Sequence, residues 1–286
     1  MKHFLIITNS FKDTGLRLTG EITRYIEAKG GTCRSFVSTG EEKGEAAPGQ
    51  SEIPKETECV IVIGGDGTLI RAASALVKSR LPLIGVNMGT LGYLCELEEK
   101  DVFLAVDRLM ADDYIIEERM MLGGYGIKNG EKIAADVALN DVVIHRSGAL
   151  SVVNLIVYVN GEYLNTFHAD GIILSTPTGS TGYNMSAGGP IVDPKAQMIL
   201  ITPINDHNLS SKSIVISAED EVAVEIGKRR SQKDETVEVS FDGDKEGSLR
   251  VGDRFIVHRA KDTARICKLS KESFLQILRK KMSAYR

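Results

Sequence analysis

One segment, VIVIGGDGTLIR at residues 60–71, constrains the fold most strongly. Its run of β-branched residues favours a buried strand, and the glycines that follow permit a sharp turn into a helix. Short apolar runs alternate with helix-like stretches over residues 1–115, which predicts an α/β domain with a parallel sheet covered by helices. The expected strands are 4–7, 60–63 and 83–86, and the expected helices are 14–29 and 69–78.

From about residue 116 the pattern changes to short alternating strands. Three dipeptides that favour tight hairpins separate β-prone runs, namely Asn129-Gly130, Asn160-Gly161 and Asp242-Gly243. This density of strands predicts a mostly β second domain over 116–268, built as a sandwich or a layered antiparallel sheet. The apolar spacing of 271–280 predicts a helix within a tail, 269–286, that we expect to pack on the first domain.

Charge and composition exclude several classes of protein. The chain has 35 Lys and Arg against 39 Asp and Glu, a net charge of −4, so no general basic field attracts nucleic acid or an anionic membrane. No apolar run approaches the roughly 18 residues of a membrane-spanning helix, and the N-terminal apolar run is too short for a signal peptide. The stretch 40–55, rich in Gly, Glu and Pro, predicts an exposed loop.

The cysteines lie far apart in the sequence and form no C-x-x-C pair; they are Cys33, Cys59, Cys95 and Cys267. This spacing argues against a zinc site and against a disulfide scaffold. We therefore expect reduced thiols in a cytoplasmic protein.

The glycine turn after residue 63 is a candidate phosphate site. Gly64, Gly65 and Gly67 let backbone N–H groups approach an anion, and the helix that follows presents its positive end. A carboxylate at Asp66 beside phosphates is unfavourable unless it binds a metal ion or accepts a proton, which indicates phosphoryl transfer. A plain strand-to-helix turn remains the alternative. The dinucleotide fingerprint G-x-G-x-x-G fails at Ile70, and no P-loop is present.

Two further segments carry polar groups next to apolar runs. The stretch 169–183, ADGIILSTPTGSTGY, is dense in hydroxyls and glycines, and SAGGPIV follows at 186–192. Such a loop can surround a ligand rich in hydrogen-bonding groups, although a Ser/Thr-rich surface loop is the alternative. In LNDVVI, at 139–144, Asn140 and Asp141 can bind vicinal ribose hydroxyls or form an Asx turn.

Taken in order, these motifs resemble the NAD kinase family over nearly the whole chain. The segment GVNMGTLGYL at 85–94 is similar to the family's G-x-N-x-G-x-L-G-F-L, and Asp242-Gly243 matches the D-G of its usual D-G-Q. The TPTGST run is highly specific. The GGDGT turn alone is shared with diacylglycerol-type lipid kinases.

The resemblance implies phosphorylation of the adenosine-ribose 2′-hydroxyl of NAD by ATP or polyphosphate, with Mg²⁺ or Mn²⁺, in a cytoplasmic homodimer or homotetramer. It assigns Asp66 as the proton acceptor, with Gly65, Gly67 and Arg71 beside the phosphates, and no protein ligand to the metal. The implied substrate-binding residues are Asn140, Asp141, His168, Asp170, Thr178, Thr181, Gly182, Tyr183, Asn184, Ser186, Asn205 and Asp244.

Two departures from the family pattern fall on that set. Asn205 and Asp206 replace Cys and Pro of the pattern T-P-I-C-P-H-S-L, and Asp244 replaces Gln after Asp242-Gly243. An ionised carboxylate only accepts hydrogen bonds, whereas the amide also donates.

A soluble lipid or sphingoid kinase is the nearest alternative function, but its substrate needs a long apolar channel in place of the hydroxyl-rich loop. The second alternative is a non-catalytic dinucleotide-sensing module. The presence of Asp66 in the glycine turn argues against it.

Overall fold

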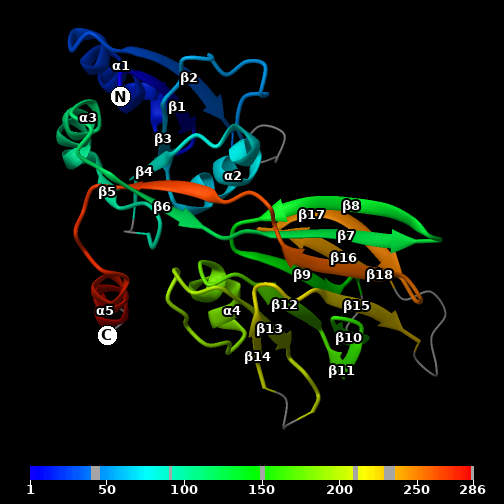
Figure 1. Cartoon of the computed structure of the whole chain (residues 1–286). Helices are drawn as coiled ribbons and strands as arrows, with labels where there is room; N and C mark the ends of the chain where they lie inside the picture. Colours follow the sequence, from blue (N-terminus) through cyan, green and yellow to red (C-terminus); the bar gives the residue numbers. More distant parts are fainter. Residues whose placement is uncertain (40–45, 90–91, 149–151, 209–211, 229–235, 285–286) are drawn as a thin grey trace. The chain divides into compact units, whose positions relative to one another are not determined.

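The structure is a computed structural model that describes residues 1–39, 46–89, 92–148, 152–208, 212–228 and 236–284. Its contacts divide the chain into two compact units, Met1–Arg119 with Asp262–Arg286, and Met120–Lys261 (Figure 1). The first is α/β and the second is built of antiparallel strands, so the predicted fold class is confirmed. The first unit also contains a strand at residues 264–268, which the sequence placed in the second domain.

The first unit is organised around one sheet with strand order β2-β1-β3-β4-β19-β6, with β5 paired to β4. Neighbouring strands are parallel except β6, which runs antiparallel to β19. The strands are β1 (His3–Asn9), β2 (Thr32–Ser38), β3 (Cys59–Gly64), β4 (Leu83–Asn87), β5 (Leu97–Glu98), β6 (Ile115–Arg119) and β19 (Ala264–Lys268). The helices are α1 (Arg17–Ala28), α2 (Asp66–Leu76), α3 (Val102–Met110) and α5 (Phe274–Ala284).

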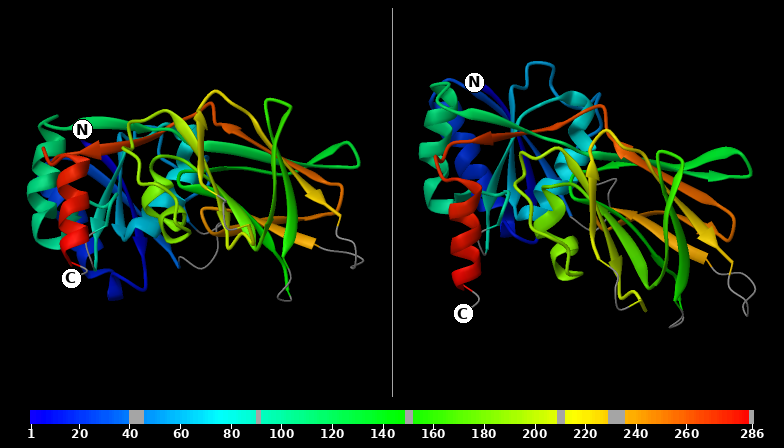
Figure 2. Two further views of the ribbon diagram at one scale, coloured as in Figure 1. Left: turned by 90° about the horizontal axis from the view of Figure 1, so that it is seen from below. Right: turned by 60° about the horizontal axis from the view of Figure 1, so that its bottom comes forward.

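Helices α1 and α3 lie side by side on one face of this sheet (Figure 2). In α1 the fully buried residues Leu18, Ile22 and Ile26 recur every four positions, which gives the helix one apolar side. They pack with alternate residues of β1 and β3, such as Phe4 and Ile61, while α2 packs on β3, β4 and β19. The predicted strand–helix alternation is thereby confirmed.

The second unit contains two six-stranded sheets, ordered β11-β10-β15-β18-β7-β8 and β14-β13-β12-β9-β16-β17. Buried side chains from both sheets form one apolar core, so the arrangement is a sandwich. The strands are β7 (Leu122–Lys128), β8 (Glu131–Ala138), β9 (Asp141–Arg146), β10 (Val153–Val159), β11 (Glu162–Ala169), β12 (Gly171–Ser175), β13 (Met198–Ile204), β14 (Ile214–Ser217), β15 (Val222–Gly227), β16 (Thr236–Phe241), β17 (Asp244–Arg250) and β18 (Arg254–Arg259). A short helix, α4 (Tyr183–Ser186), follows β12.

The three predicted hairpins are present, joining β7 to β8, β10 to β11 and β16 to β17. Each turn has both residues at positive φ, as in Asp242 (φ 51°) and Gly243 (φ 90°). Asparagine, aspartate and glycine tolerate that conformation, which explains why the sequence signals these turns.

The loop prediction for 40–55 is partly wrong. Residues 40–45 lie outside the described part of the chain. Residues 46–55 form no helix or strand, but Ala46 and Ala47 are buried (2% and 9% exposed). Small apolar side chains can fill a gap in packing without any periodic pattern to announce it.

Helix α5 begins at Phe274 and ends at Ala284, a few residues later than the predicted 271–280. Its start is fixed by a capping box, because the Ser273 N–H donates to Gln276 Oε1 (2.8 Å) and the Gln276 N–H donates to Ser273 Oγ (3.3 Å). The helix belongs to the first unit.

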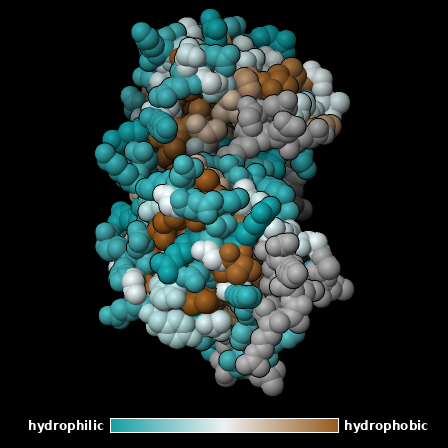
Figure 3. Space-filling model, turned by 90° about the vertical axis from the view of Figure 1, so that its right-hand side faces the viewer, coloured by the Kyte–Doolittle hydropathy of each residue, from teal (hydrophilic) through white to brown (hydrophobic). Residues whose placement is uncertain are grey.

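In the described part of the chain no helix is long and apolar enough to cross a membrane. The face of the molecule drawn in Figure 3 is largely hydrophilic, with separate apolar patches. All four cysteines are free thiols, three of them buried.

Candidate active site

In the first unit, the glycine turn joins β3 to α2. At Gly64 an added Cβ would lie 2.4 Å from Thr68 Oγ1, so only glycine lets Thr68 fold back over the turn. A Cβ at Gly65 or Gly67, by contrast, would meet no atom of the described residues within 4 Å. The described part of the chain therefore leaves space at the start of this eleven-residue helix, where an anion can accept hydrogen bonds from its first N–H groups. Arg71 follows on the same helix.

Asp66 is held by the backbone of a second turn. Its Oδ2 accepts from the N–H of Tyr93 (2.6 Å), and its Oδ1 accepts from those of Leu94 (3.2 Å) and Cys95 (2.9 Å). At Gly92 an added Cβ would lie 1.8 Å from Oδ1, so the carboxylate occupies the place of a side chain there. This binding of Asp66 by residues 92–95 was not foreseen from the sequence.

The thiol of Cys95 also hydrogen-bonds to Asp66. Burial raises the pKa of Cys95, and the charge of Asp66 and their hydrogen bond raise it further, so the thiol stays protonated. Three N–H groups and one thiol therefore surround a carboxylate that has about four acceptor positions.

In the second unit, Asp242 fixes the turn before β9. Its carboxylate accepts from three consecutive N–H groups, those of Leu139 (2.8 Å), Asn140 (2.7 Å) and Asp141 (3.1 Å). In return the N–H of Asp242 donates to the carbonyl of Asp141 (3.0 Å). The D-G turn of one hairpin thus sets the position of the Asn-Asp pair about 100 residues earlier in the sequence.

The hydroxyl-rich loop closes on the same turn. Thr176 donates from Oγ1 to the Leu139 carbonyl (2.6 Å) and from its N–H to the Asn140 carbonyl (2.8 Å). At Gly179 an added Cβ would lie 2.2 Å from Asn140 O, so this approach requires glycine. Three separate sequence motifs therefore meet at residues 139–141.

A cavity of about 590 Å³ opens beside this turn. It is lined by Asn140, Asp141, Val143, His145, Arg146, Asp170, Tyr183, Ile204, Asn205, Ser240, Asp242 and Gly243. Five of the predicted substrate-binding residues are among them: Asn140, Asp141, Asp170, Tyr183 and Asn205.

Seven lining residues were not predicted as substrate-binding, and two of them carry basic side chains, His145 and Arg146. A signal was present for His145, because Asp141, Val143 and His145 are two residues apart and so lie on one face of β9. Once Asp141 is assigned to a ligand site, the period of the strand places His145 on that side. Arg146 lies at the end of β9, where this alternation gives no guide.

Asp141 is the most perturbed acid of the cavity. Its side chain is 5% exposed, and burial, followed by the negative charge of Asp242, raises the pKa of Asp141 to about 7. At neutral pH the group is therefore protonated in a large fraction of molecules. In that form it can both donate and accept a hydrogen bond.

Asp170 has the opposite environment. Its Oδ2 accepts from Asn205 Nδ2 (3.0 Å) and its Oδ1 accepts from Arg146 Nε (2.9 Å). The hydrogen bond from Asn205, with the bond and charge of Arg146, lowers the pKa of Asp170 and keeps it ionised. The departure at position 205 therefore gives this chain an amide donor to a predicted substrate-binding carboxylate.

Replacing Asn205 by alanine is expected to raise the pKa of Asp170 towards its ordinary range, because one donor to the carboxylate is lost. The side-chain carboxyl ¹³C shift of Asp170, followed against pH, measures this. Asn165→Ala on β11 is the matched control and should leave the titration unchanged. An unchanged titration in Asn205→Ala would show that Arg146 alone holds the charge.

The other predicted residues do not line the cavity; they are His168, Thr178, Thr181, Gly182, Asn184, Ser186 and Asp244. The prediction for Asn184 is corrected, because its side chain is fully buried and holds Ser180 O (3.3 Å), Pro190 O (3.0 Å) and the Thr202 hydroxyl (2.7 Å). Asn184 therefore fastens the loop to β13. An asparagine inside a motif gives no sign of whether it faces a ligand or the core.

Three more of the predicted residues outside the cavity lining can be placed from their surroundings; they are Gly182, Thr178 and His168. A Cβ on Gly182 would be 3.5 Å from Asn140 Nδ2, so this glycine adjoins the Asn-Asp pair. Thr178 Oγ1 is buried without a hydrogen-bond partner in the described part of the chain. His168 is exposed on β11, where its Nδ1 contacts Asn154 Oδ1 (2.7 Å).

Among the described residues, no three His, Cys, Asp or Glu side chains are grouped so that they could hold a metal ion. At the glycine turn, Asp66 provides the carboxylate, and backbone N–H groups donate to both of its oxygens.

A glycine turn at a helix start in an α/β unit, and a polar cavity in a β-sandwich unit, define a nucleotide-binding phosphotransferase. Residues 4–114 match the ATP-NAD kinase N-terminal domain, and residues 139–269 match the ATP-NAD kinase C-terminal domain. The chain belongs to the NAD kinase family, as the sequence motifs indicated.

Similar proteins support this membership along the full length. The chain is 57% identical to an NAD kinase of Agathobacter rectalis over 100% of both chains, and 43% identical to one of Lachnospira eligens over 99% of this chain and 100% of that one. The fold is similar to a yeast NADH kinase complexed with NADH, with a TM-score of 0.86, 23% identity and coverage of 99% and 88% of the two chains. The fold is also similar to that of an Archaeoglobus fulgidus NAD kinase in complex with ATP, with a TM-score of 0.73, 20% identity and coverage of 94% of each chain.

Proposed function

We propose that this NAD kinase transfers a phosphoryl group from ATP or polyphosphate to the adenosine-ribose 2′-hydroxyl of NAD, giving NADP. The observation that carries the proposal is the meeting of the Asn-Asp pair, the TPTGST loop and the Asp242-Gly243 turn at residues 139–141. These are the segments on which the family resemblance rests. Nothing in a plain turn or a surface loop requires all three to converge beside a cavity.

The cavity of the second unit is the proposed dinucleotide site. Asn140 offers an amide, and Asp141 a carboxyl group with a proton near neutral pH, to adjacent ribose hydroxyls. The ionised Asp170, held by Arg146 and Asn205, offers acceptor oxygens to amide or hydroxyl donors of the ligand. The yeast relative complexed with NADH and the archaeal one complexed with ATP support these two classes of ligand.

The glycine turn of the first unit is the proposed phosphate site. The open helix start at Gly65 and Gly67 favours the negative charge of the donor phosphates. Asp66 is the proposed acceptor of the proton that leaves the attacking hydroxyl. To accept it, the carboxylate must exchange one of its four present donors for that hydroxyl.

Mg²⁺ or Mn²⁺ is proposed to arrive bound to the phosphates, where it neutralises their charge, because the described side chains provide no metal cluster. We also propose a cytoplasmic homodimer or homotetramer that binds neither nucleic acid nor membrane. The net charge of −4 supports the absence of binding to nucleic acid and membrane. The family resemblance supports the oligomeric state and the location.

Incubation with NAD, a phosphoryl donor and Mg²⁺ should give a product heavier than NAD by one phosphate, detected by mass spectrometry. Omission of the donor, or removal of the cation by a chelator, should abolish it. Parallel reactions with ATP and polyphosphate identify the donor. Phosphorylation of diacylglycerol with no consumption of NAD or NADH would favour the lipid-kinase alternative.

A further inference from the structure

Residues 92–96 have contacts on two sides. On one side the N–H groups of Tyr93, Leu94 and Cys95 hold Asp66. On the other side the next residue, Glu96, binds the segment that leads into the C-terminal helix. The segment is therefore a short covalent link between the carboxylate of the glycine turn and the end of the chain.

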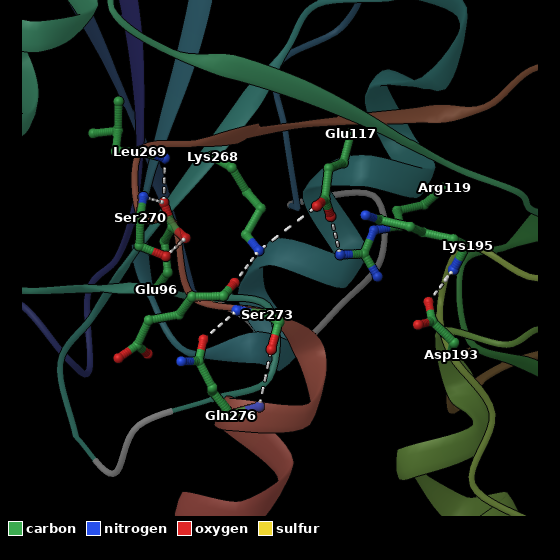
Figure 4. A network of polar contacts seen from close by, with 11 residues as sticks. Glu96, Glu117, Arg119, Asp193, Lys195, Lys268, Leu269, Ser270, Ser273 and Gln276 are labelled. Atoms are coloured by element: carbon green, nitrogen blue, oxygen red, sulfur yellow. Dashed lines mark hydrogen bonds and ion pairs between the residues drawn. The ribbon is translucent and has the colours of Figure 1, made fainter.

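The contact of Glu96 is made by both carboxylate oxygens (Figure 4). Oε1 accepts from the N–H groups of Leu269 (2.5 Å) and Ser270 (3.2 Å), and Oε2 accepts from the Ser270 hydroxyl (3.0 Å). Leu269 is buried in the apolar core of the first unit. Hydrogen bonds to a charged acceptor are among the stronger ones in proteins, so this contact fixes where the C-terminal segment meets the 92–96 segment.

Helix α5 makes a second contact with the same segment. Lys281 Nζ lies 4.7 Å from the centroid of the Tyr93 ring, a cation–π distance. The helix is anchored at its start by the Ser273–Gln276 capping box and by Lys268, whose Nζ donates to the Glu272 carbonyl (2.9 Å). Tyr93 is thus held at its ring by α5, while its backbone N–H holds Asp66.

We propose that Glu96 and Lys281 are positioning residues for Asp66, acting through the 92–95 turn. The inference rests on the proposed role of Asp66 as proton acceptor. Neither side chain need touch a substrate, because each fixes a part of the segment whose N–H groups orient the carboxylate. Displacement of a reacting group by about 1 Å can lower a rate by about a hundredfold, so loosening this segment should lower kcat more than it raises KM.

Glu96→Ala removes three hydrogen bonds from the C-terminal segment and should lower kcat about ten- to a hundredfold, with KM for NAD and ATP changed less than about threefold. Glu96→Gln should restore most of kcat, because its amide oxygen can still accept from both N–H groups. Glu98→Ala is the matched control, since among the described residues the side chain of Glu98 forms an ion pair with exposed Lys100. Wild-type kcat in Glu96→Ala would overturn the proposal.

Lys281→Ala tests the link without touching a buried group, so it remains informative if Glu96→Ala does not fold. Loss of this partly exposed cation–π contact, at about 0.5 to 1 kcal/mol, corresponds to a kcat about two- to fivefold lower. Lys281→Arg should keep kcat, and Lys280→Ala, on the same helix but paired with Glu272, should not lower it. Equal effects of Lys280→Ala and Lys281→Ala would overturn the part of the proposal that concerns α5.

A double-mutant cycle separates the proposal from its basis. In an Asp66→Asn background, Glu96→Ala or Lys281→Ala should lower the residual kcat no further, because the proton acceptor is already absent. Additive losses would overturn the positioning role while leaving the proposed role of Asp66 intact. Wild-type kcat in Asp66→Asn alone would instead overturn the role of Asp66 itself.

Discussion

Asp66→Asn should lower kcat by about 10² to 10⁴, the usual effect of removing a general base, while NAD affinity changes little. The variant should remain folded, because its amide oxygen can still accept from Leu94 and Cys95, which both donate to Oδ1 in the wild type. The hydrogen bond from the Tyr93 N–H to Oδ2 is lost, because an amide nitrogen at that position cannot accept it.

Steady-state kinetics with NAD and ATP, together with NAD titration by calorimetry, measure the two quantities separately. Asp101→Asn, a surface carboxylate of the same unit, is the control and should behave as the wild type. A near wild-type kcat in Asp66→Asn would leave Asp66 only the structural task of holding the 92–95 turn.

Asp141→Asn should change the pH dependence of stability. The pKa of Asp141 is raised from 3.8 to about 7 in the folded protein, so between these values the folded state keeps a proton that the unfolded chain has lost. Over that window the wild type loses stability as pH rises, by roughly 1.4 kcal/mol per unit and roughly 4 kcal/mol at most, with no further change above it. Asparagine cannot ionise, so the variant lacks this loss.

Urea unfolding of both proteins from pH 4 to pH 8 tests the sign. The variant should gain stability relative to the wild type as pH rises, with most of the gain complete by about pH 7. Asp262→Asn is the control substitution. A constant difference between the two curves would mean that Asp141 is ionised throughout, so that burial and the charge of Asp242 do not act on it as described.

Local features of the fold could be predicted from the sequence. The strand–turn–helix at 60–71 and the hairpin at Asp242-Gly243 each depend on residues adjacent in the chain, where β-branched runs and glycines act directly on the backbone. The start of α5 was predicted a few residues early, although the Ser273–Gln276 capping box was a visible signal.

Long-range features could not be predicted in that way. Strand β19 joins the first sheet by pairing Ile266 with Leu83. No local sequence pattern around either residue indicates this pairing. Similarly, the motif at 139–141 predicted Asn140 and Asp141 as ligand groups, but the hydrogen bonds by which Asp242 holds this turn become visible only in three dimensions. Asn184 was misassigned because a motif gives residue types without their burial.

The position of the new phosphate in the reaction product tests the central claim most directly. Two-dimensional ¹H–³¹P NMR of the purified product from NAD, ATP and Mg²⁺ should show the new phosphorus coupled to the 2′ proton of the adenosine ribose. Coupling to a 3′ proton or to a proton of the nicotinamide ribose would contradict the proposed reaction, as would the absence of any phosphorylated dinucleotide.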